Sequence, residues 1–202
     1  MRLITKKLTM ANCKIIVDGN SLTVYGGVNL HDKIKANPLT SAATCVGFGV
    51  SGQTTAQMIA DQQSQIIAAF DPAKKNIVIA LELGNHISVD SVTGAVAHAS
   101  YRQYGQAIRA AGGKFIACTA FDRNSVASPN PSVRTGINIA NNLMRDQWPG
   151  YANALVDVQR WLSAVFDNAE NRGYWPDGVH YEPFAYDLFA NYCAYTISKL
   201  SA

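Results

Sequence analysis

The chain repeats one pattern about five times: a short apolar run is followed by a segment whose apolar residues recur at helical spacing. The clearest run, Ile77-Val78-Ile79-Ala80-Leu81, is apolar at every position. Strands buried on both faces of a parallel sheet have this composition, whereas strands with one face in water alternate apolar and polar residues. The repeated alternation predicts an α/β fold, a three-layer α/β/α sandwich around a mostly parallel five-stranded sheet.

Runs of apolar residues and turn signals give the expected boundaries. Strands are predicted at residues 13–17, 43–48, 76–83, 114–119 and 154–158, and helices at 54–70, 95–111, 133–148 and 183–200. Residues 25–38 are predicted to form a loop or short broken helix, 122–131 a long loop, and 160–175 a short helix with a loop. We expect a polar lead-in at residues 1–11.

Length and charge limit the class of protein. With 202 residues, of which 48% are hydrophobic and 15% charged, the chain can bury one substantial core, and we expect one domain over residues 1–202. The net charge of +3 is small, and the basic pairs Lys6-Lys7 and Lys74-Lys75 are isolated. Nothing in this pattern predicts a nucleic-acid partner.

Targeting signals and metal motifs are not evident. The residues after Lys6-Lys7 are too few and too polar for a secretory signal, and no apolar run approaches the length of a membrane span. We expect a cytoplasmic location by default, with export by another route or association with a virion left open. The cysteines are scattered and predict reduced thiols, and no Cys/His spacing predicts a metal site. They are Cys13, Cys45, Cys118 and Cys193.

The turn after the first predicted strand carries a hydroxyl. Residues 18–23 read Asp-Gly-Asn-Ser-Leu-Thr and follow an apolar run, so Ser21 is expected where a strand gives way to a helix begun by Leu22-Thr23. Gly19 permits the dihedral angles of a tight turn, and Asn20 tolerates them better than most residues. On local sequence alone, an ordinary turn in which Ser21 or Thr23 merely caps a helix is the favoured interpretation of the segment.

Four more candidate residues follow predicted strands or precede the last helix. Gly52 follows the second strand, Asn85 follows the third, and Asp177 and His180 lie in the turn before the final helix. Because ligands of parallel sheets bind at the carboxyl ends of the strands, these groups and Ser21 are expected along one edge.

Together these residues supply every group that acyl transfer to a serine requires. The reaction needs a nucleophile, a base that takes its proton, an acid that orients the base, and donors to the oxyanion. Ser21 is the predicted nucleophile, His180 the base and Asp177 the orienting acid. The predicted oxyanion donors are the backbone amides of Ser21 and Gly52 and the side-chain amide of Asn85.

Four stretches of the chain resemble, in order, the four sequence blocks of the SGNH hydrolases, also called GDSL-type esterases and lipases. The resemblance implies the flavodoxin-like SGNH hydrolase fold and a serine esterase that forms an acyl-enzyme and needs neither cofactor nor metal. It implies the same roles for Ser21, Gly52, Asn85, Asp177 and His180. The matching stretches are Gly19-Asn20-Ser21-Leu22-Thr23, Val50-Ser51-Gly52-Gln53-Thr54-Thr55, Leu83-Gly84-Asn85-His86 and Asp177-Gly178-Val179-His180.

The chain departs from the family pattern at three positions. Asn20 replaces the aspartate most common before the nucleophile, Leu83 stands where many members have glycine, and His86 stands where aspartate is usual. Whether His86 faces a pocket or the core is left open, whereas His31 and His98 are predicted to lie on the surface or on a helix face. The substrate is expected to be a small-molecule or carbohydrate ester. The absence of a long apolar lid segment favours O-acetyl sugars over long lipids.

Two other classes of function fit parts of the sequence. The run Gly47-Phe48-Gly49-Val50-Ser51-Gly52 is a G-x-G-x-x-G, and Glu82 could bind a ribose hydroxyl, as in a dinucleotide-binding oxidoreductase. That hypothesis leaves Ser21, Asn85 and His180 without a role. A carbohydrate-binding or structural module that no longer turns over substrate is the second alternative.

Overall fold

A five-stranded sheet in the order β4-β1-β5-β6-β7 forms the middle layer, and each neighbouring pair of strands is parallel. The computed structural model describes residues 10–121, 130–161, 177, 179–180 and 182–201. A short 3₁₀ turn, Met10–Asn12, precedes the first strand. The strands of the sheet are β1 (Cys13–Gly19), β4 (Thr44–Gly47), β5 (Lys75–Leu81), β6 (Lys114–Cys118) and β7 (Ala154–Val156).

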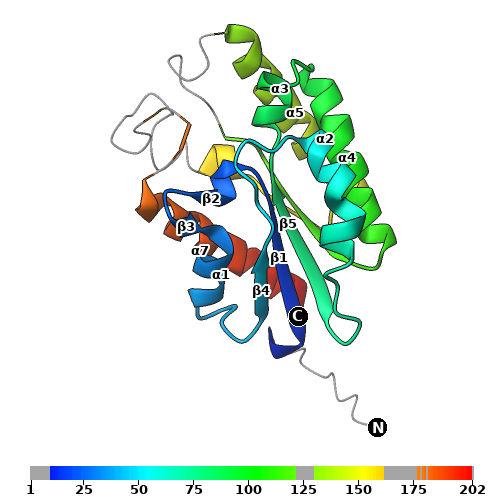
Figure 1. Ribbon diagram of the computed structural model, residues 1–202, viewed down its shortest axis with the longest axis vertical. Helices are drawn as coiled ribbons and strands as arrows, with labels where there is room; N and C mark the ends of the chain where they lie inside the picture. Colours follow the sequence, from blue (N-terminus) through cyan, green and yellow to red (C-terminus); the bar gives the residue numbers. More distant parts are fainter. Residues whose placement is uncertain (1–9, 122–129, 162–176, 178, 181, 202) are drawn as a thin grey trace.

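Helices cover both faces of this sheet (Figure 1). On one face lie α1 (Leu30–Ala36) and α7 (Pro183–Ser201); on the other lie α2 (Thr55–Asp61), α4 (Gly94–Ala110) and α5 (Pro131–Gln147). The predicted α/β/α sandwich, with a flavodoxin-like strand order, is therefore confirmed. No helix in the described part of the chain is long and apolar enough to cross a membrane.

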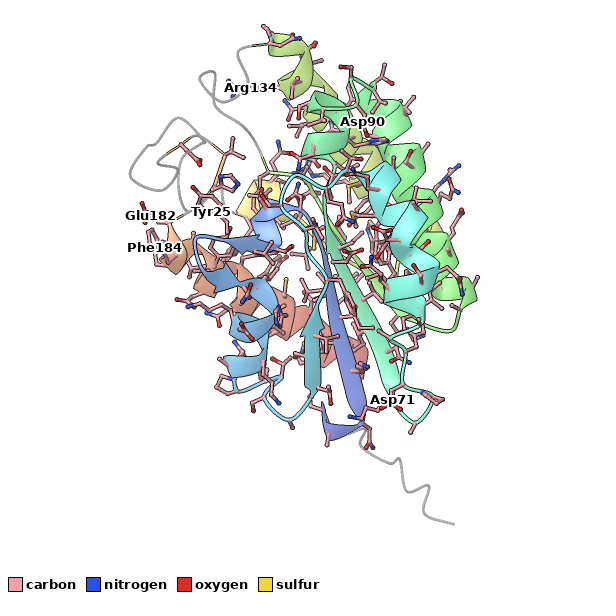
Figure 2. All side chains as sticks on the ribbon, in the orientation of Figure 1. Tyr25, Asp71, Asp90, Arg134, Glu182 and Phe184 are labelled. Atoms are coloured by element: carbon pink, nitrogen blue, oxygen red, sulfur yellow. The ribbon has the colours of Figure 1, made fainter. Side chains whose placement is uncertain are left out.

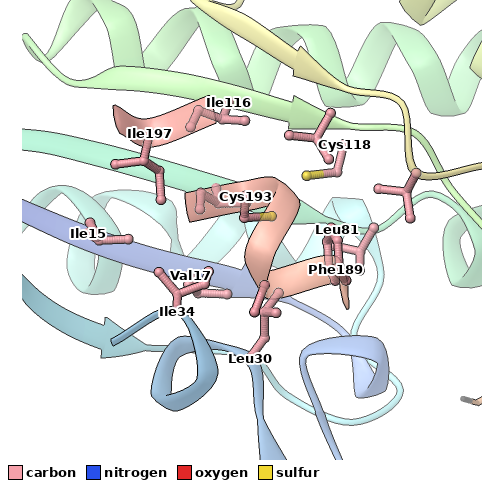
Figure 3. Packing of buried hydrophobic residues seen from close by; sticks show 14 of the residues in the cluster. Ile15, Val17, Leu30, Ile34, Leu81, Ile116, Cys118, Phe189, Cys193 and Ile197 are labelled. Atoms are coloured by element: carbon pink, nitrogen blue, oxygen red, sulfur yellow. The ribbon is translucent and has the colours of Figure 1, made fainter. Parts of the chain in front are cut away.

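The central strands contain uninterrupted apolar runs, at 15–17 in β1 and 77–81 in β5, because each face of the sheet has its own core. Ile15 and Val17 of β1 pack with α1 and α7, while Ile16, between them, packs toward α2 and α4. Figure 3 shows the first cluster, in which Phe189 of α7 lies near Leu81 of β5. A strand with one solvated face would have needed polar residues at alternate positions.

The segment predicted as a loop or broken helix, residues 25–38, is more regular than expected. A two-stranded hairpin, β2 (Val24–Tyr25) and β3 (Val28–Asn29), precedes α1. Gly26 and Gly27 turn the hairpin with φ angles of 62° and 77°. Positive φ at both central residues defines the turn that matches strand twist, which explains the paired glycines.

The predicted helix at residues 54–70 changes form midway. After α2, residues Gln62–Ile67 form a π-helical stretch. The buried Gln62 side chain donates a hydrogen bond of 2.7 Å to the carbonyl oxygen of Tyr104 on α4. This polar contact with a neighbouring helix accompanies the widened turn.

Smaller differences occur at the ends of elements. Residues Gly84–Ser88 form an unexpected short helix, α3, and Pro131 begins α5 rather than ending a loop. Proline suits the first helical turn, where its missing N–H would have had no partner. Residues Trp148–Gly150 form a 3₁₀ turn. The predicted lead-in, the loop at 122–131 and the mixed segment at 160–175 fall mainly outside the described residues.

Candidate active site

A tight turn at the end of β1 holds the Ser21 hydroxyl at the rim of the sheet. Gly19 has a φ of 145°, and a Cβ atom there would lie 2.3 Å from the carbonyl oxygen of Leu81, so only glycine lets β1 end this close to β5. The Asn20 side chain accepts a 2.9 Å hydrogen bond from the amide of Leu22. Ser21–Thr23 form one 3₁₀ turn that leads into the hairpin, so the helix expected to begin at Leu22-Thr23 is a wrong prediction.

The structure brings the predicted nucleophile, base and acid together. His180 Nε2 lies 2.8 Å from Ser21 Oγ, and His180 Nδ1 lies 2.7 Å from Asp177 Oδ2. The other Asp177 oxygen accepts hydrogen bonds from the backbone amides of Val179, at 2.9 Å, and His180, at 2.7 Å. These backbone bonds fold the turn around the carboxylate, so the three-residue spacing of Asp177 and His180 points both side chains at each other.

The Asp177 carboxylate is held ionised although it is partly buried. Burial by itself raises its pKa, but the hydrogen bonds from the His180 amide and ring and from the Val179 amide outweigh it and lower the pKa to about 2. At neutral pH the group therefore carries a full negative charge beside the imidazole. Its side chain is 42% exposed, compared with 16% for His180.

Tyr25, which begins the segment predicted to form a loop or short broken helix, contacts both of these residues. Its ring stacks on the His180 imidazole, with centroids 3.6 Å apart and planes 4° from parallel. Its hydroxyl donates a 3.2 Å hydrogen bond to Asp177 Oδ2. The Gly26-Gly27 pair that directly follows this tyrosine was the available sequence signal that it is held in a hairpin.

The two other predicted oxyanion donors lie on the loop after β4 and in the first turn of α3. The segment after β4 is bound to β1 through the Val50 amide, which donates 2.9 Å to the Gly19 carbonyl oxygen. Gly52 has a φ of 81° in this segment and is exposed. The Asn85 side-chain amide donates a 3.2 Å hydrogen bond to the carbonyl oxygen of Gln53. Asn85 and the Gly52 loop are thus in direct contact at the carboxyl ends of β5 and β4.

The buried Glu82 carboxylate binds the first residues of α3. Glu82 is 1% exposed, and one carboxylate oxygen accepts hydrogen bonds from the amides of Asn85, at 2.7 Å, and His86, at 3.1 Å. The other oxygen accepts a hydrogen bond from the Thr55 hydroxyl. Burial raises the pKa of Glu82 despite these bonds. Its oxygens are engaged inside the protein, which corrects the suggestion that it faces a ribose.

The glycines of the dinucleotide-like motif make room for the chain's own side chains. A Cβ atom at Gly47 would lie 2.2 Å from His31 Nδ1, and one at Gly49 would lie 1.9 Å from Thr23 Oγ1. Both close approaches pack the β4 segment against α1 and the Ser21 turn. The G-x-G spacing is therefore explained by packing within the protein rather than by the binding of a phosphate group.

The remaining histidines lie away from the Ser21 site. His86 is buried, with Nδ1 2.7 Å from Asp90 and Nε2 3.3 Å from Ser100, so it faces the α3–α4 contact rather than a pocket. His98 lies on the inner face of α4 against Tyr151, and His31 lies half-buried on α1. Among the described residues, no cluster of His, Cys, Asp and Glu could hold a metal. All four cysteines are free thiols, and three are buried.

A small cavity adjoins the Ser21 turn. Its volume is about 10 Å³, which is close to the space needed by one water molecule. Residues on both sides of Ser21 line it together with the loop after β5 and the segment that carries His180. The lining residues are Asn20, Leu22, Leu81, Glu82, Leu83, Gly84, Ala120, Phe121 and Val179.

Comparison with known proteins gives matches in structure but not in sequence. No protein-family model and no curated protein matches the chain. A candidate GDSL-like lipase from Parabacteroides merdae has 17% sequence identity and a TM-score of 0.75, over 95% of this chain and 97% of that one. A lipase/acylhydrolase from Enterococcus faecalis has 16% identity and a TM-score of 0.69, over 92% and 95%.

A third similar structure is a catalytic mutant of an acetylxylan esterase from Geobacillus stearothermophilus, with 15% identity and a TM-score of 0.66, over 92% of this chain and 93% of that one. At such identities the likeness establishes the fold. The chain has the fold of the GDSL-type lipases and esterases, as the four sequence stretches implied.

Proposed function

We propose that this protein is a serine esterase of the SGNH type, which hydrolyses a carboxylic ester through Ser21, His180 and Asp177. The observation that supports this proposal is a continuous chain of two hydrogen bonds. One joins Ser21 Oγ and His180 Nε2, at 2.8 Å, and the other joins His180 Nδ1 and Asp177, at 2.7 Å. An imidazole that donates to a carboxylate through Nδ1 has its Nε2 lone pair free to accept the serine proton.

The first half of the proposed reaction acylates Ser21. Oγ attacks the ester carbonyl carbon while its proton passes to His180 Nε2, and the carbonyl π electrons move to the oxygen. The amides of Ser21 and Gly52 and the Asn85 side chain are the proposed donors to that oxyanion. Collapse of the tetrahedral intermediate breaks the ester C–O bond, and His180 gives its proton to the leaving alcohol.

The second half releases the acid. Water gives a proton to His180 as its oxygen attacks the acyl carbon, and collapse returns the proton to Ser21 Oγ while the carboxylic acid departs. Asp177 stabilises the imidazolium that forms in each half. No step consumes a cofactor.

Two observations support a short acyl group. The cavity beside the Ser21 turn, at about 10 Å³, is too small for an alkyl chain. Acetylxylan esterase is among the proteins of similar structure, and its catalytic mutants carry alanine in place of a serine or a histidine. We therefore propose an acetyl ester, with a carbohydrate as the alcohol part, as the substrate.

The test is hydrolysis of p-nitrophenyl acetate by wild type and Ser21→Ala. Loss of the nucleophile should lower kcat by at least about 10⁴-fold. Ser41→Ala is the matched control, because Ser41 is exposed and its hydroxyl bonds only within its own turn. Its rate should equal that of wild type. Equal rates for wild type and Ser21→Ala would refute the mechanism, and faster hydrolysis of octanoyl than of acetyl esters would refute the acyl-group assignment.

A further inference from the structure

The hairpin that follows the nucleophile reaches across the site to the base and the acid. We propose that Tyr25 is a positioning residue that fixes the His180 ring and the Asp177 carboxylate in line with Ser21. This inference rests on the proposed function and adds a residue to its machinery. Figure 2 shows Tyr25 close to Glu182 and Phe184 at the start of α7, whereas Asp71 lies at the opposite end of the sheet.

The stacked ring limits how the imidazole can turn. The torsion that rotates a histidine ring has a broad energy profile, so hydrogen bonds alone leave the ring free to tilt. At a centroid separation of 3.6 Å and an interplanar angle of 4°, the Tyr25 ring covers one face of His180 at van der Waals contact. If the imidazole tilted toward Tyr25, the two rings would clash. The stack therefore helps to preserve the 2.8 Å hydrogen bond between His180 Nε2 and Ser21 Oγ.

The hydroxyl limits how the carboxylate can turn. Tyr25 donates to Oδ2, the same Asp177 oxygen that lies 2.7 Å from His180 Nδ1. Because the Asp177 side chain is 42% exposed, water would otherwise compete for this oxygen. The Asp177 charge and its hydrogen bond raise the pKa of the Tyr25 phenol, so it stays a donor at neutral pH.

Tyr25 can serve this role because its backbone is fixed close to the nucleophile. It pairs with Val28 across the glycine turn and lies four residues after Ser21. The same short segment therefore contacts His180 twice, through the Ser21 hydroxyl at Nε2 and through the Tyr25 ring on its face. A platform that only stacks against sugar would instead present both the ring and the hydroxyl to substrate.

The proposal predicts a loss in kcat without a matching change in KM. In Tyr25→Leu the ring and the hydroxyl are both absent, and we expect kcat for p-nitrophenyl acetate to fall about 30-fold, because small misplacements of catalytic groups cost up to about 100-fold. In Tyr25→Phe the stack remains, and the lost hydrogen bond should lower kcat about 3-fold. KM should stay within about 2-fold of wild type in both variants, since neither removes ground-state binding.

A second readout removes substrate binding from the comparison. The rate at which a fluorophosphonate labels Ser21 depends on activation of the hydroxyl by His180, so it should fall in parallel with kcat and be largely restored in Tyr25→Phe. Tyr195→Leu is the matched control: Tyr195 is an exposed tyrosine of α7 whose ring contacts Lys199, and its loss should change neither rate.

Three results would overturn the inference. Tyr25→Leu could match wild type in kcat and labelling, or it could raise KM with kcat unchanged, as expected for a sugar platform. If Tyr25→Leu does not fold, a Tyr25→Phe rate equal to wild type would refute the hydroxyl's role. Failure of wild type itself to hydrolyse esters or to be labelled at Ser21 would instead overturn the proposed function, and this inference with it.

Discussion

Two aspartates of this protein have similar hydrogen-bond partners, but their pKa values are shifted in opposite directions. Asp18 lies three residues before Ser21, and Asp177 lies three residues before His180. Each accepts a hydrogen bond from a tyrosine hydroxyl and from a backbone amide: Asp18 from Tyr104 and Gly19, and Asp177 from Tyr25 and Val179. Yet the pKa of Asp18 is raised to about 6, and that of Asp177 is lowered to about 2.

Burial accounts for the difference. Asp18 is 2% exposed beneath the sheet edge, and desolvation of its charged form outweighs the two hydrogen bonds. Asp177 is half-exposed and also faces the imidazole and a second amide, so its charged form is favoured. The pKa of each aspartate therefore follows the partners and the solvent exposure of its carboxylate, and not its distance in sequence from Ser21.

Replacement of the exposed carboxylate should have the larger effect on turnover. In Asp177→Asn the amide can no longer accept from His180 Nδ1–H with a full charge, and the imidazole loses both its tautomer preference and its counter-charge. We expect kcat for p-nitrophenyl acetate to fall by about 10³- to 10⁴-fold. The free energy of unfolding at neutral pH, measured by denaturant titration, should change by less than about 1 kcal/mol. A kcat within tenfold of wild type would contradict the assigned role.

Replacement of the buried carboxylate should instead change how stability depends on pH. Between about pH 4 and 6, folded Asp18 keeps a proton that the unfolded chain has lost, so wild-type stability falls as pH rises through this range. Asp18→Asn does not titrate. The unfolding free energy of wild type minus that of Asp18→Asn should therefore fall by on the order of 2 to 3 kcal/mol from pH 4 to pH 7. A difference independent of pH would show that the Asp18 pKa is ordinary.

Removing the tyrosine hydroxyl that donates to each aspartate should give the smallest effects in this comparison. Tyr104→Phe removes a 2.6 Å hydrogen bond from a buried carboxylate and should destabilise the protein by about 1 to 3 kcal/mol. Tyr25→Phe removes a bond at an exposed carboxylate, where water can replace it, and should cost less than about 0.5 kcal/mol. Chemical denaturation of both variants at pH 7 measures the two changes in the free energy of unfolding. Equal costs would mean that burial does not separate the two sites.

The fold was predictable because its strands are short, apolar on both faces and separated by helical patterns. All five strands of the sheet lie within the predicted regions or extend them by up to two residues, as β1 does to Gly19. The hairpin at Tyr25 was not predicted, because strands of two residues have no measurable alternation. The π-helical stretch after α2 was also missed, since apolar spacing does not separate it from an α-helix.

The four sequence stretches could be placed near one another because each follows a strand or precedes the last helix, at one edge of the sheet. The contacts of Tyr25 and Glu82 were not accessible in this way. Tyr25 bonds to Asp177, 152 positions later in the chain, and Glu82 bonds to Thr55, 27 positions earlier. Both side chains are ordinary in their local sequence, and only the packed fold gives them partners.

The separation of the nucleophile and the base has a consequence for folding. Ser21 and His180 are 159 positions apart, and α7 begins three residues after His180. Under the proposed mechanism, an intermediate with β1 and β5 paired but α7 undocked would hold Ser21 without His180 and would not hydrolyse an ester. Closing a loop of this length is entropically costly and tends to be slow. The rate at which hydrolysis recovers during refolding would therefore report when the final helix docks.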